Sequence, residues 1–296
     1  MSSSPKKILV PIDFSEQSLI ALDQSYNLAK GYKAEVVLAH VIEDSGPISR
    51  IFSKEQNEEM EKTIRENLKK LAADAEKKGG VKTSIRVPRG KAYEEIVKLG
   101  ETLPAELIIM GCDSSPSGLK KRFIGSTALR IVRESKVPVI TIRGKHHRSG
   151  CKNIVLPLDL TKETKEKVSK AIELSNLFGG AAIHVVSVVQ TSDEFLVNKL
   201  TRQLGQAKSF IEKSGVECSA EIIKGTQSKI TLAQTIIDYA NKVEGDLLMI
   251  MTQQEQNFTK YFIGSSAQEI INNSNIPVLS IVPSLKKDVS TGFLNI

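Results

Sequence analysis

The segment from Met110 to Thr127, MGCDSSPSGLKKRFIGST, combines the residue types that bind phosphate. It contains three glycines, several hydroxyl side chains and the basic run Lys120–Arg122, and it lies between an apolar run and a predicted helix. The free N–H groups and positive potential of a helix N-terminus favour a phosphate. A glycine turn followed by a Ser/Thr helix cap is the structural alternative, and the segment taken alone slightly favours that alternative.

The end of this segment is the part best suited to phosphate. Gly125 would let the backbone approach a ligand, and the hydroxyl groups of Ser126 and Thr127 could bond phosphate oxygens. No GKS or GKT follows a glycine loop, and no GxGxxG occurs. The sequence therefore excludes a Walker loop and a dinucleotide fingerprint.

Two residues at predicted strand ends carry groups that could act on a ligand. Asp13 closes the first strand, where open parallel sheets bind their ligands, but the dipole of the helix that begins near Ser15 accounts for a carboxylate equally well. His40 follows the second strand, with His184 interpreted as its counterpart in the second half. Because no serine or cysteine nucleophile stands at a recognisable spacing, a structural role for His40 is favoured and we predict no catalytic site.

Composition limits the classes of partner. The 296 residues carry a net charge of +7 with acidic and basic residues interspersed, which permits an anionic ligand but shows no nucleic-acid-binding stripe. Cys112, Cys151 and Cys218 lie far apart, without zinc or disulfide spacing. No apolar run reaches membrane-spanning length. We therefore expect a cytoplasmic protein that binds neither nucleic acid nor membrane.

An internal repeat organises the chain. ILVPIDFS at 8–15 returns as IVLPLDLT at 154–161, FIGS returns at 262–265, and VPVITI returns as IPVLSI. Three similar segments that occur in the same order in both halves indicate a duplicated domain. The sequence predicts domains at 1–145 and 150–285, followed by a tail at 286–296.

Strands and helices alternate in each half. Short apolar runs bounded by polar residues are typical of buried parallel strands, and longer segments between them have helical periodicity. The pattern predicts two α/β domains, each an open five-stranded parallel sheet with helices on both faces. The predicted strands are 7–13, 35–42, 83–88, 106–111, 138–142, 154–159, 182–189, 218–224, 246–252 and 277–282.

The order of these segments is similar to that of the universal stress protein family in its tandem form. The resemblance rests on ILVPIDFSEQSLIAL, VVLAHVIE, ELIIMG and FIGSTALRIVRESKVPVITI, together with the duplication, and spans nearly the whole chain. It implies a Rossmann-like fold of the adenine nucleotide α-hydrolase type. It also implies an intramolecular pseudo-dimer of the two domains through their last strands, and it allows a homodimer.

The resemblance further implies that ATP, with Mg²⁺, binds the first domain. ATP-binding members carry glycine, two residues, glycine, nine residues, then glycine with serine or threonine. Here Ser114 replaces the second glycine, and ten residues separate it from Gly125. Asp13 would lie near the ribose and the backbone of Val41 beside adenine. The implied site comprises Pro11, Asp13, Ser15, Val41, Met110, Gly111, Ser114, Gly125, Ser126 and Thr127.

The second half keeps little of this pattern. MTQQEQNFTKYFIGSS has no glycine between Met251 and Gly264, and only Asp159, Gly264, Ser265 and Ser266 remain. We predict that this half does not bind ATP. The favoured function is a stress-response regulatory module without enzymatic activity. The alternatives are a protein-interaction scaffold that binds no nucleotide and a slow ATP hydrolase.

Overall fold

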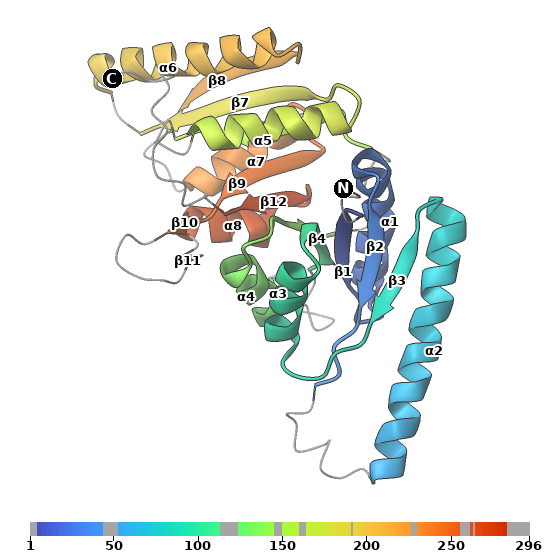
Figure 1. The fold of residues 1–296 in the computed structure, drawn as a ribbon. Helices are drawn as coiled ribbons and strands as arrows, with labels where there is room; N and C mark the ends of the chain where they lie inside the picture. The colour runs from blue at the N-terminus through green and yellow to red at the C-terminus, as the bar shows by residue number, and fades with distance from the viewer. Residues whose placement is uncertain are drawn as a thin grey trace. The chain divides into compact units, whose positions relative to one another are not determined.

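The chain forms two compact units, Met1–Ser149 and Gly150–Ile296, each with its own α/β core (Figure 1). The computed structural model describes residues 5–43, 53–112, 124–144, 150–159, 164–190, 192–225, 230–254, 261–262 and 264–282.

The sheet of the first unit is parallel throughout, in the order β3-β2-β1-β4-β5. Its central strand β1 buries Ile8, Leu9 and Val10 completely, without the alternation of a half-exposed strand, because helices cover both faces. The strand order reverses between β1 and β4, which creates the position where such sheets bind ligands. The strands are β1 (Lys7–Pro11), β2 (Glu35–Ala39), β3 (Thr83–Arg86), β4 (Ala105–Gly111) and β5 (Val139–Ile142).

Helices cover the two faces of this sheet in pairs. Right-handed crossovers place α1 and α2 on one face, because β1, β2 and β3 follow in one direction. The chain then returns to β4 and β5, which places α3 and α4 on the other face, and the helices of each pair contact each other. The helices are α1 (Glu16–Tyr32), α2 (Lys54–Gly79), α3 (Ala92–Thr102) and α4 (Ser126–Glu134).

The second unit repeats this topology as β8-β7-β6-β9-β12. Its strands are β6 (Asn153–Pro157), β7 (Ala182–Val189), β8 (Cys218–Lys224), β9 (Leu247–Met251) and β12 (Val278–Ile281). Its helices are α5 (Thr164–Leu177), α6 (Glu194–Lys213), α7 (Leu232–Lys242) and α8 (Ser265–Asn273). The predicted fold class, two repeated open parallel sheets with helices on both faces, is confirmed.

The structure adds a feature to the second unit that the sequence did not predict. After β9, the strands β10 (Gln253–Gln254) and β11 (Tyr261–Phe262) form a short antiparallel ribbon, in which Gln253 pairs with Phe262. The ribbon lies between β9 and α8, and the sequence analysis assigned no strand to this segment. These paired residues belong to the segment that has no glycine between Met251 and Gly264.

Strand register corrects the assignment of His184. Leu9 of β1 pairs with Val37, whereas the equivalent Val155 of β6 pairs with His184. His184 is therefore the counterpart of Val37, and the counterpart of His40 is Ser187. His184 instead contacts the side chains of Ser219 and Asn153 at 2.8 and 3.2 Å across neighbouring strands. In the described part of the chain, no helix is long and apolar enough to cross a membrane.

Candidate functional site

A cavity of about 200 Å³ opens where β1 and β4 end in the first unit. Several residues predicted from the sequence line it: Pro11, Asp13, Val41, Met110, Gly111, Gly125 and Thr127. Ser15 and Ser126 were also predicted, but they are not among the residues that line this cavity. Ser114 lies outside the described residues. The strand-end position that the fold favours for a ligand thus coincides with an actual cavity.

Asp13 is fixed by the turn that joins β1 to α1. Its Oδ1 accepts hydrogen bonds from the Ser15 N–H at 2.9 Å and from the Ser15 hydroxyl at 2.5 Å. Ser15 in turn caps α1, because its Oγ accepts a bond from the Ser18 N–H at 3.2 Å. Burial opposes the charged carboxylate, but the bonds from Ser15 and Ser18 outweigh it and lower the pKa of Asp13 below its ordinary 3.8. Ser15 is thus used to orient Asp13, which remains exposed at the cavity.

We expect the carboxylate of Asp13 to make stability pH-dependent in acid. Since its pKa is depressed in the folded chain, its contribution is present above about pH 4 and is lost as pH falls through the folded pKa. Urea unfolding of the wild type and Asp13→Asn between pH 3 and 7 measures this contribution. The stability difference between the two should be constant near neutrality and should shrink in acid. The same difference at every pH would contradict the assignment.

The N-terminus of α4 faces the same cavity without a side-chain cap. Its N-cap is Gly125, with φ −58° and ψ 148°, an extended conformation that any residue can adopt. In the described part of the chain, the N-cap residue of α4 gives no side-chain cap bond, as in α8, whereas α1, α2, α6 and α7 have caps from Ser15, Ser53, Asp193 and Thr231. The backbone dihedral angles therefore do not require a glycine at this position, which borders the cavity. An uncapped helix start beside a cavity offers N–H donors and positive potential to an anion.

Gly111 has a packing reason that the sequence did not reveal. A Cβ at this position would lie 2.3 Å from the carbonyl carbon and oxygen of Gln17 and 2.7 Å from the Ser18 nitrogen. The end of β4 thus presses directly against the first turn of α1. The sequence interpretation assigned this glycine to a phosphate, but close backbone packing is sufficient to require it.

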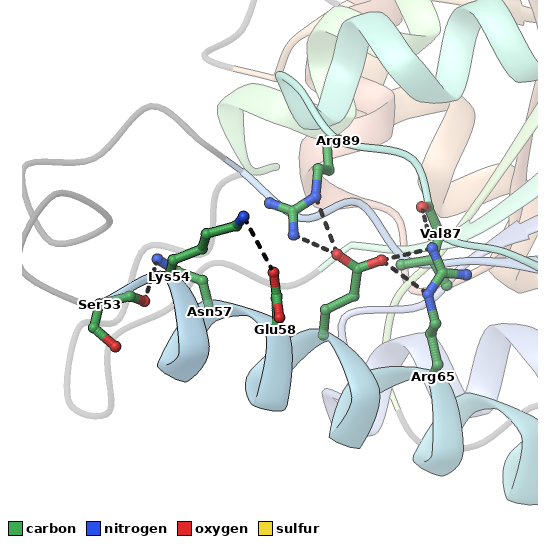
Figure 2. Close-up of polar contacts among 8 residues, drawn as sticks. Ser53, Lys54, Asn57, Glu58, Arg65, Val87 and Arg89 are labelled. Atoms are coloured by element: carbon green, nitrogen blue, oxygen red, sulfur yellow. Dashed lines mark hydrogen bonds and ion pairs between the residues drawn. The ribbon is translucent and has the colours of Figure 1, made fainter.

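A second set of contacts holds the Val41 side of the cavity. Ile42 forms a parallel bridge with Arg89, its N–H donates to the Pro88 carbonyl, and its own carbonyl accepts from the Gly90 N–H, each at 3.0 Å. The Arg89 guanidinium bonds the carboxylate of Glu61 on α2, which also accepts two bonds from Arg65 (Figure 2). These arginine bonds lower the pKa of Glu61. The network ties the segment after Val41 to the long helix α2.

Sequence reasoning missed most of the apolar lining. Ala92 and Ile96 from α3 and Ala128 and Ile131 from α4 close the cavity. Their spacing of three or four residues is the pattern of any buried helix face, so it gives no separate signal for a site. Ser18 and Cys112 also line the cavity and were not predicted as ligand contacts. Ser18 donates to the Ser15 carbonyl at 2.9 Å, and Cys112 is a buried thiol.

The second unit places a lysine beside the counterpart of Asp13. Asp159 corresponds to Asp13 by an offset of 146, and the same offset sets Lys167 on α5 where α1 has Ala21. Both Lys167 and Ala21 are buried in their helices. The Lys167 ammonium lies 3.3 Å from Oδ1 of Asp159. Lys167 therefore neutralises the carboxylate of Asp159. Its counterpart in the first unit, Asp13, remains exposed at the cavity.

Together these features define a class: a tandem α/β protein whose first repeat has a strand-end cavity between an aspartate and an uncapped helix start. The family model for the universal stress proteins matches residues 5–143 and 150–281. The chain belongs to the universal stress protein family, and the resemblance recognised in the sequence is confirmed.

Individual relatives match one half or the whole of the chain. Universal stress protein MJ0577 of Methanocaldococcus jannaschii is 34% identical over 167 residues, covering 49% of this chain and 99% of that protein. MJ0531 of the same organism is 32% identical over 142 residues, covering 47% and 82%. A universal stress protein structure from Archaeoglobus fulgidus covers 94% of this chain and 97% of its own, with a TM-score of 0.73 and 20% identity. That similarity shows that the tandem fold extends over nearly the whole chain.

Proposed function

We propose that this tandem universal stress protein binds ATP in its first domain and acts as a non-catalytic regulatory module. The observation that carries the proposal is the cavity in which Asp13, Val41 and the glycine-capped start of α4 meet at the switch in strand order. The family resemblance assigns ribose, adenine and phosphate to these same groups. Geometry and resemblance therefore support one ligand.

The size and lining of the cavity favour the nucleoside as its occupant. Pockets for complete drug-sized ligands measure roughly 300–1,000 Å³, so a cavity of about 200 Å³ suits only part of ATP. Its walls include the apolar Ile12, Ala39 and Ile96, which suit a base, beside the Asp13 carboxylate, which accepts bonds from hydroxyl groups. The phosphates would then extend along the first turn of α4, where N–H groups favour anions.

Magnesium fits this site only as a companion of the phosphates. The described residues contain no group of three or more histidine, cysteine, aspartate or glutamate side chains that could hold a metal ion. Mg²⁺ commonly binds through substrate phosphates and water, with one or two carboxylates. Among the described residues that line the cavity, only Asp13 has a carboxylate, and Ser15 already donates two bonds to it. We therefore propose that Mg²⁺ enters with ATP.

The second domain is proposed not to take nucleotide. Lys167 neutralises Asp159, the expected ribose contact, and the β10–β11 ribbon follows β9 where the first domain has its glycine-containing segment. One ATP per chain is the resulting stoichiometry.

Gly125→Val tests the phosphate end of the proposed site. The branched side chain would stand at the start of α4, and we expect ATP affinity to fall by about tenfold, the cost of one displaced contact of roughly 1.4 kcal/mol. Isothermal titration calorimetry with ATP and Mg²⁺ measures it. Gly264→Val is the matched control, because Gly264 caps α8 with nearly the same angles, φ −57° and ψ 152°. The control should bind ATP as the wild type does.

Unchanged ATP affinity in folded Gly125→Val would contradict the placement of the phosphates. A fall in stoichiometry with Gly264→Val would contradict the restriction to the first domain. The scaffold alternative makes a separate prediction: the purified chain would carry no adenine nucleotide, and ATP with Mg²⁺ would not raise its Tm.

A further inference from the structure

Phe14 has an unusual backbone conformation at the edge of the cavity. Its φ is 64°, in the left-handed region that bulky residues rarely adopt. Lys33 and Glu244 also have positive φ, but they follow α1 and α7, where a left-handed residue is a common way to end a helix. Phe14 ends no helix, since it lies in the turn between β1 and α1. Its strain therefore calls for another explanation.

Burial does not explain the position of the Phe14 ring. The residue is 39% exposed, although it is large and apolar. Its ring lies against the imidazole of His40, with centroids 5.2 Å apart and planes inclined by 42°. The bond between Asp13 and the Ser15 N–H closes the turn around Phe14. The strained backbone conformation of Phe14 thus places its aromatic ring against the imidazole of His40.

His40 is held on the other sides by its own hydrogen bonds. Its Nδ1 lies 2.7 Å from the Ile12 carbonyl oxygen, and its backbone N–H donates to the Arg86 carbonyl at 3.0 Å. Because a carbonyl oxygen only accepts, Nδ1 is the donor, which leaves Nε2 available as an acceptor in the neutral ring. His40 also lines the cavity, between Ala39 and Val41. The hydrogen bond from Nδ1 therefore fixes the imidazole of a residue that borders the cavity, next to Val41, which the family resemblance places beside adenine.

The second domain has neither member of this aromatic pair. The offset of 146 places Leu160 opposite Phe14 in the sequence, and strand register places Ser187 opposite His40. The pair is thus confined to the first domain. An aromatic pair needed only to complete the fold would be expected in both repeats.

We propose that His40 contacts the nucleoside end of the bound adenine nucleotide and that Phe14 is the positioning residue that holds its imidazole there. The proposal rests on the function proposed above. Nε2 is suited to accept a hydrogen bond from a ribose hydroxyl or from the adenine amino group. Phe14 acts through His40, since it does not itself line the cavity.

A double-mutant cycle tests the pair, with ATP and AMP each titrated in the presence of Mg²⁺. Phe14→Ala should weaken both nucleotides by about threefold to tenfold, the range expected for one aromatic contact. The factor should be the same for both, because the contact lies at the nucleoside. Phe14→Tyr keeps the ring and should bind within about twofold of the wild type. In a His40→Ala background, Phe14→Ala should have no further effect on affinity.

Phe14→Gly separates this role from a structural one. Glycine adopts positive φ without strain, so the Tm should equal or exceed that of the wild type while ATP affinity still falls. A wild type that binds ATP, with Phe14→Ala and Phe14→Gly binding equally well, would overturn the proposal and leave the nucleotide site intact. An undiminished effect of Phe14→Ala in the His40→Ala background would overturn the action through His40. A wild type that binds neither nucleotide would overturn both proposals.

Discussion

Gly111→Ala is expected to destabilise the first domain by about 3 kcal/mol or more, the upper end of the usual cost of overpacking. The new methyl carbon would lie 2.3 Å from two backbone atoms of Gln17. Backbone at the start of a helix cannot rotate away as a side chain can, so β4 or α1 must shift. For a unit of this size, the loss corresponds to a fall in Tm of roughly 10 °C, which thermal unfolding followed by circular dichroism measures.

Gly205→Ala is the control for this substitution. Gly205 lies within α6, without positive φ, and a Cβ there would meet nothing within 4 Å. Because alanine is the better helix former, this variant should gain about 1 kcal/mol. If Gly111→Ala lowers the stability and Gly205→Ala raises it, close packing is the reason that position 111 requires glycine. If Gly111→Ala unfolds like the wild type but loses ATP affinity, the phosphate interpretation of this glycine would be correct instead.

The sequence was sufficient to predict the repeat, the open parallel α/β fold of each half and the edge of the sheet where a ligand would be expected. These depend on local patterns: the returns of VPVITI and FIGS, apolar strands between amphipathic helices, and the rule that places ligands at strand ends. Asp13 and Val41 line the cavity, and each stands two residues after the end of a strand, β1 or β2.

The side chains that complete the cavity could not be predicted in this way. Ile96 and Ile131 have the same spacing as residues buried for stability alone, and only the packed fold shows that they face a cavity. The hydroxyl of Ser15 resembled a ligand contact, but it caps α1 and binds Asp13. Helix capping and phosphate binding use the same residue types, so the sequence alone does not distinguish them.

Two further features needed the folded backbone. A left-handed Phe14 has no sequence signal, because aromatic residues are rare at positive φ. The strands β10 and β11 are two residues each, too short for an alternation pattern to be detected. By contrast, Lys167 did leave a signal: the repeat aligns it with the buried Ala21, and a lysine at a buried helix position requires a partner.

The partner of Lys167 is Asp159, and its substitution has the second large expected effect. Asp159→Asn should destabilise the second domain by about 2 kcal/mol. Removing one member of a buried pair costs roughly 3–5 kcal/mol because the other charge is left in a poor environment. The Lys167 side chain is only 11% exposed, whereas that of Asp159 is 48% exposed, so solvent reduces this cost. Urea unfolding at neutral pH measures the change.

Lys167→Met provides the comparison, because methionine keeps most of the side-chain volume and needs no counter-charge. It should be neutral within about 1 kcal/mol, since an apolar replacement removes the desolvation cost together with the attraction. The double variant Asp159→Asn/Lys167→Met should then recover most of the loss. Equal destabilisation by the two single variants would show that Lys167 acts through packing. A cost below about 0.5 kcal/mol for Asp159→Asn would place the pair among weak surface contacts, and the lysine would then be no barrier to a ligand in the second domain.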